Sequence, residues 1–256
     1  MNTHAKTIDP SEAARSDAPA PTATAANSAT PAAAIAAASA TSRRWRREWG
    51  PALEAVGFWA LILAYMWGIE FRVSVAWNIL CQVALGTIPI VSFALHREWP
   101  RTLGLRLDNL GRSAREVGVM TLAASAAILA CGIGGGVALR VDAGLIPIWL
   151  VYVVWGLLQQ LALQGFVQRR LSGAFRERRA TALVSAALFA SLHLPNPVLA
   201  PATLVAGYAW CRLYARTPNL VTLACSHATL AVLALAAFPP AWTHHLRVGP
   251  GYWLHV

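Results

Sequence analysis

The chain has 256 residues, of which 57% are hydrophobic and only 12% are charged. Soluble domains carry roughly 25% charged residues, so this composition excludes most soluble folds, coiled coils and disorder over the whole length. The net charge of +10 would suit a nucleic-acid partner, but the basic residues follow another pattern along the chain.

The N-terminal segment 1–42 consists mainly of alanine, threonine, serine and proline. It shows no hydrophobic period, and such a segment cannot bury enough apolar surface to offset the entropy of ordering it. The composition therefore predicts a disordered tail over residues 1–42.

Seven apolar runs follow the tail. They lie near residues 52–69, 75–95, 117–139, 144–166, 181–194, 197–211 and 219–238. A membrane-spanning helix needs about 20 apolar residues, and four of the runs reach that length comfortably. The fifth and sixth runs are short and flank Pro195 and Pro197, which bend or end helices. We expect an all-α fold, a polytopic membrane bundle of about seven transmembrane helices.

The chain divides at its polar segments. Residues 43–100 hold the first two transmembrane helices, 101–238 form the main domain, and 239–256 form an extracytoplasmic tail. Within the main domain, 108–116 resembles a short cytoplasmic helix lying before the third span.

The arginines give an independent indication of topology. If the N-terminus is cytoplasmic and every run crosses, sixteen of the arginines after residue 42 fall on the cytoplasmic side and three on the opposite side. Such a bias follows the positive-inside rule. We therefore expect an integral protein of the bacterial inner (plasma) membrane with a cytoplasmic N-terminus, the lipid bilayer as partner and no nucleic acid.

Polar side chains inside a bilayer are costly and are functional candidates by default. Three clusters occur in the runs: Gln159, Gln160 and Gln164; Phe189, His193 and Asn196; and Ser226 with His227. At about 1.5 Å rise per residue, the three clusters lie at similar depth from the cytoplasmic side. This depth predicts one site between the helices of a bundle. Hydrogen bonding between helices explains the glutamines equally well.

The order and spacing of these residues resemble the CPBP family of intramembrane proteases, which includes the CAAX prenyl endopeptidases. That family carries Glu-Glu-x-x-x-Arg in one helix, Phe-x-x-x-His in the next and His-x-x-x-Asn in a later one. Here QQLALQGFVQRRL has Gln159 and Gln160 at the glutamate pair and Gln164 at the arginine. The segment FASLHLPNP matches the second motif, and the resemblance covers about residues 100–238. The third motif begins at His227 but has Ala231 in place of the asparagine.

The resemblance implies roles for the polar clusters. The catalytic positions fall on Gln159, Gln160, Gln164, His193 and His227, and Phe189 and Asn196 fall in the substrate pocket. In the family, a glutamate in the membrane activates water and the histidines help to bind the water and the developing oxyanion. A glutamine amide cannot accept a proton as a carboxylate does, so the substitution changes the chemistry.

Three functions are compatible with these residues. The first is an intramembrane endopeptidase, a CAAX protease-like hydrolase that cuts a membrane-tethered or lipidated peptide with atypical glutamines. The second is a catalytically inactive relative, a pseudoenzyme that binds such a peptide or a membrane partner. A transporter is the weakest, because no inverted repeat is visible. No cofactor is expected, since a divalent metal at His193 and His227 would have too few good ligands.

Overall fold

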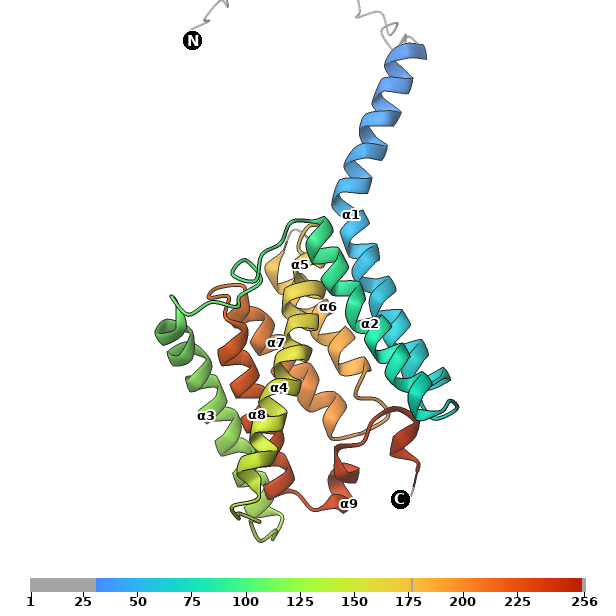
Figure 1. The fold of residues 1–256 in the computed structure, drawn as a ribbon. Helices are drawn as coiled ribbons and strands as arrows, with labels where there is room; N and C mark the ends of the chain where they lie inside the picture. Colours follow the sequence, from blue (N-terminus) through green and yellow to red (C-terminus); the bar gives the residue numbers. More distant parts are fainter. Residues whose placement is uncertain (1–30, 176, 255–256) are drawn as a thin grey trace, which may run out of the picture. The chain divides into compact units, whose positions relative to one another are not determined.

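The computed structural model describes residues 31–175 and 177–254, and these are helical with no strand among them. Helices longer than ten residues are α1 (Pro31–Gly68), α2 (Val75–Leu95), α3 (Leu110–Gly134), α4 (Leu145–Gln160), α6 (Arg178–Ser191), α7 (Leu199–Tyr214) and α8 (Leu220–Ala237). Shorter elements are the π-helix η2 (Leu161–Gln168), α5 (Arg169–Leu171), α9 (Pro240–Thr243) and the 3-10 helices η3 (His244–Leu246) and η4 (Gly249–Tyr252). Figure 1 shows their arrangement.

The helices confirm the predicted all-α membrane bundle. Among the described residues, five segments are long and apolar enough to cross a membrane: Trp49–Gly68, Val75–Leu95, Leu110–Gly134, Leu145–Leu171 and Leu220–Ala237. The remaining two helices, α6 and α7, have 14 and 16 residues and fall below the length of a full span. A count of seven spans therefore stays a prediction.

Two segments differ from the sequence-based expectation. Residues 31–42, expected to be disordered, form the start of α1. Alanine is the best helix former and Pro31 suits the first helical position, so this stretch is locally biased toward a helix. Residues 1–30 lie outside the described part. The short helix expected at 108–116 is the first part of α3, because no proline interrupts the segment that joins it to the third apolar run.

The chain forms two compact units, Met1–Arg44 and Trp45–Val256. In the second unit, α8 packs along both α3 and α4, and α7 packs along α6 (Figure 1). Hydroxyl pairs join α3 to α8: Ser113 Oγ lies 2.7 Å from Thr222 Oγ1, and Thr121 Oγ1 lies 2.7 Å from Ser226 Oγ. Such pairs satisfy polar groups that lipid cannot hydrate, and they fix the position of α8.

Aromatic packing attaches α1 and α2 to the second half of the chain. Phe166 of η2 makes edge-to-face contacts with Phe58 of α1 and Phe93 of α2, at 5.1 and 5.9 Å between ring centroids. Trp59 also donates a 2.6 Å hydrogen bond from Nε1 to the carbonyl of Leu188 in α6. These contacts position both N-terminal helices around the π-helix.

Candidate active site

The glutamines expected to be catalytic form a buried column where α4 passes into η2. Gln160 and Gln164 are fully buried, and Gln168 is 5% exposed. Gln164 Nε2 donates to Gln160 Oε1 at 3.4 Å, and Gln168 Nε2 donates to the carbonyl of Cys211 in α7 at 2.8 Å. π-helical turns are rare in proteins, but those that occur are often found at functional sites. Because η2 carries part of this column, the column is a candidate functional site.

His227 of α8 contacts Gln160, the first residue of this column. Its Nδ1 lies 3.5 Å from Gln160 Nε2. The indole of Trp210 stacks on the imidazole, with 5.0 Å between centroids and 18° between planes. Trp210 is itself fixed by a 3.0 Å hydrogen bond from Nε1 to Ser226 Oγ. On the α4 side, a Cβ added to Gly156 would lie 3.3 Å from His227 Cβ, so the glycine gives the histidine room.

His193 follows α6 and lies near the same aromatic ring as His227. Its Nδ1 is 2.9 Å from the Phe189 carbonyl, and its ring centroid is 4.8 Å from that of Phe189. The Phe189 ring also makes an edge-to-face contact with His227, at 6.1 Å between centroids. Phe189 therefore contacts both histidines.

Hydrogen bonding assigns a tautomer to each histidine. A carbonyl can only accept, so His193 Nδ1 carries the hydrogen and its Nε2 keeps a free lone pair. The Gln160 amide nitrogen donates to His227 Nδ1, so His227 carries its hydrogen on Nε2. The site thus combines one imidazole that can accept a proton with one that can donate a hydrogen bond.

The structure brings most of the predicted residues together. Gln160, Gln164, Phe189, His193 and His227 form one connected cluster. Their catalytic roles stay predictions.

Two of the predicted residues lie differently, and one neighbour was not predicted. Gln159 is half-buried, and its Oε1 has no hydrogen-bond partner among the described residues. Asn196 is fully buried, but its amide donates to the carbonyls of Thr243 and Arg247 and its Oδ1 accepts from the start of α7. Trp210 was missed, because a tryptophan in an apolar helix gives no signal of function.

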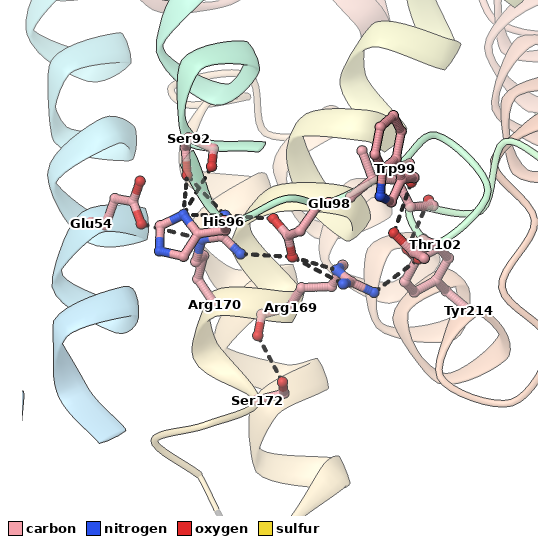
Figure 2. Close-up of polar contacts among 11 residues, drawn as sticks. Glu54, Ser92, His96, Glu98, Trp99, Thr102, Arg169, Arg170, Ser172 and Tyr214 are labelled. Atoms are coloured by element: carbon pink, nitrogen blue, oxygen red, sulfur yellow. Dashed lines mark hydrogen bonds and ion pairs between the residues drawn. The ribbon is translucent and has the colours of Figure 1, made fainter. Parts of the chain in front are cut away.

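A second polar cluster lies where η2 ends and α5 begins (Figure 2). Arg170, 6% exposed, donates to Glu98 at 2.6 and 3.0 Å, to Ser92 Oγ at 2.8 Å and to Glu54 at 3.2 Å. Arg169 donates to the same Glu98 carboxylate at 2.9 Å. The cluster links α1, α2 and the 96–109 loop to the end of the glutamine column. Both acidic side chains that it contains are paired with arginine.

The charge of Glu98 depends on its arginines. Burial disfavours the charged carboxylate, but hydrogen bonds from Arg170 and Arg169 outweigh burial and lower the pKa of Glu98. A carboxyl group whose pKa is lowered by folding contributes stability that is fully present above its unfolded pKa, about 4.3. That stability disappears as the pH falls through the lower folded value.

Glu98→Gln is therefore expected to lower the free energy of unfolding at neutral pH and to lower it less as the pH falls below about 4.3. Denaturant titration of both proteins over this pH range measures the difference between their free energies of unfolding. Carboxyl groups that both proteins share cancel from this difference. A difference in free energy of unfolding that stays constant down to the lowest pH measured would contradict the role assigned to Glu98.

Within the described residues, no group of three histidine, cysteine, aspartate or glutamate side chains is arranged to hold a metal ion. Two imidazoles surrounded by neutral amides do not fit a divalent ion, which usually takes three good protein ligands.

Comparison with known proteins gives one match. Residues 141–233 match the family described as type II CAAX prenyl endopeptidase Rce1-like. The match runs from the segment before α4 into α8 and includes the glutamine column and both histidines. No curated protein and no solved structure is significantly similar to the chain. Residues 141–233 are thus similar to the Rce1-like family, and this match confirms the resemblance to the CPBP intramembrane proteases.

Proposed function

We propose that this chain is an intramembrane endopeptidase that cuts a membrane-tethered or lipidated peptide at the Gln160–His193–His227 cluster. The main support is the pair of histidines that both contact Phe189 and have opposite tautomers. One imidazole offers a lone pair and the other offers an N–H, which are the two groups that amide hydrolysis needs.

The reaction follows from these two groups. Water attacks the carbonyl carbon of the scissile amide while His193 Nε2 accepts its proton. The carbonyl oxygen becomes an oxyanion, to which His227 Nε2–H donates a hydrogen bond. The imidazolium of His193 then returns the proton to the amide nitrogen, the C–N bond breaks, and a carboxylic acid and an amine leave. Trp210 and Gln160 hold the His227 ring in place during these steps.

A catalytically inactive relative that binds the same peptide is the second candidate. Glutamines occupy both positions of the family's glutamate pair, and a neutral amide cannot act as a base. The nearby carboxylates Glu54 and Glu98 are engaged by Arg170. This candidate retains the peptide site and lacks turnover.

Alanine substitution of the histidines separates these candidates. We expect His193→Ala and His227→Ala each to abolish cleavage of a fluorogenic membrane-tethered peptide by the protein in liposomes. His245→Ala, in the C-terminal segment, is the matched control and should cleave at the wild-type rate. Cleavage at the wild-type rate by both site variants would overturn the assignment. Peptide binding by the wild type with no detectable cleavage would favour the inactive relative.

We also propose that the N-terminus is cytoplasmic and that the chain lies in a bacterial inner membrane. The arginine bias supports this orientation, since basic residues stay on the cytoplasmic side. Alkaline phosphatase fused after Arg140 or at the C-terminus should be active, because both points would lie outside. A fusion after Arg216 should be inactive. Cytoplasmic signals from both outer fusions would reverse the orientation.

A further inference from the structure

Besides Gln159 Oε1, three buried polar atoms near the candidate site have no hydrogen-bond partner within the described part of the chain. They are Gln164 Oε1, Gln168 Oε1 and Ser185 Oγ. Gln164 and Ser185 are fully buried, and Gln168 is 5% exposed. Buried polar side-chain atoms in stable proteins are nearly always paired with protein or with ordered water, so three such atoms in one region require an explanation.

The three side chains lie on η2 and α6, which pack against each other and against α7. Gln168 donates to the Cys211 carbonyl of α7 at 2.8 Å. Gly207, one turn earlier in α7, packs against Ala186 and Phe189 of α6. Ser185 precedes Ala186 on α6, which packs along α7. The unpaired atoms therefore come from η2 and α6, two helices that pack against each other.

The chemistry of the three atoms defines the ligand. The two unpaired atoms on the glutamines are amide oxygens, which can only accept hydrogen bonds. A matching ligand must donate at least two hydrogen bonds and must be small enough for a closed helix contact. Water meets both conditions, and buried waters typically make about three hydrogen bonds to such groups.

We propose that Gln164, Gln168 and Ser185 form a buried hydration site, which holds ordered water beside the Gln160–His227 pair. Gln164 connects the two regions, because its nitrogen donates to Gln160 Oε1 at 3.4 Å and Gln160 in turn contacts His227. If the proposed function is correct, the site keeps water within reach of a hydrolytic centre that lies in lipid. The hydration site itself does not depend on cleavage.

Water-edited solid-state NMR of the full chain in lipid bilayers tests the site directly. Magnetisation from water should build up quickly on the side-chain amide protons of Gln164 and Gln168. Asn219 is the matched control: it is also fully buried, but its amide nitrogen donates to Arg106 O and Asn109 Oδ1 at 2.8 and 2.9 Å. Equally slow build-up on all three amides would overturn the proposal.

Ser185→Ala gives a second readout that needs neither NMR assignment nor activity. If the Ser185 hydroxyl binds water, its removal leaves that water short of a partner and lowers the Tm. If the hydroxyl is unpaired, its removal relieves a buried polar group and raises the Tm. Ser113→Ala removes a hydroxyl that is paired with Thr222. Its change in Tm shows the cost of losing a hydrogen-bonded hydroxyl. A Tm raised by Ser185→Ala would contradict the hydration site, even if cleavage is later demonstrated.

Discussion

Arg170→Met is expected to lower the free energy of unfolding by about 3–5 kcal/mol, the usual cost of removing one partner from a buried ion pair. Arg170 is 6% exposed and Glu98 has a side-chain exposure of 12%, so the remaining carboxylate would stay largely out of water with the partly exposed Arg169 as its arginine partner. Methionine keeps the length and packing of the side chain and removes only its charge and donors. Denaturant titration in detergent micelles, monitored by tryptophan fluorescence, measures the loss.

Arg169→Met is the matched control for this prediction. Arg169 contacts the same carboxylate but is 33% exposed, and partly solvated ion pairs contribute about 0–1 kcal/mol. The double variant Arg170→Met/Glu98→Leu should recover most of the loss, because it removes the buried charge along with its partner. An Arg170→Met loss within about 1 kcal/mol of the Arg169→Met loss would show that the cluster is solvated and contributes little.

The positions of the helices could be predicted because a membrane requires long apolar runs. The runs at 75–95 and 219–238 match α2 and α8 almost residue for residue. The start of α1 was not predicted, because alanine favours helix formation locally without adding the hydrophobic period on which the prediction depended. The division into seven spans was harder to predict, since α6 and α7 are short on either side of the bend at Pro195 and Pro197.

Depth along the helices predicted part of the site, because the rise per residue is nearly constant. Gln160 and His227 do meet, but depth alone cannot say which helices are neighbours. It also could not distinguish Gln160, which contacts His227, from Gln159, whose Oε1 has no hydrogen-bond partner among the described residues.

Contacts made by loops, and contacts between residues far apart in the chain, could not be predicted from the sequence. Glu98 follows α2 and pairs with Arg170, 72 residues later. Neither residue carries a local pattern that identifies its partner. Asn196 has the same limitation: its position beside His193 suggested a pocket residue, whereas its amide binds the backbone of the C-terminal segment.

Gln159→Glu is expected to raise the rate of peptide cleavage by about 10²–10⁴, the usual contribution of a general acid or base. The substitution puts a carboxylate at a half-buried position whose Oε1 has no partner among the described residues, so it displaces no hydrogen bond there.

The neighbouring Gln160→Glu adds the same charge and is the matched control. Its carboxylate can only accept, so His227 would carry its hydrogen on Nδ1 and donate from there. His227 Nε2 would then have no hydrogen, which removes the donor proposed to face the oxyanion. We therefore expect cleavage to rise with Gln159→Glu and to fall with Gln160→Glu in the same liposome assay. Equal rates for the two variants would show that the tautomer of His227 does not control the reaction, and no change with Gln159→Glu would show that a missing carboxylate is not what limits it.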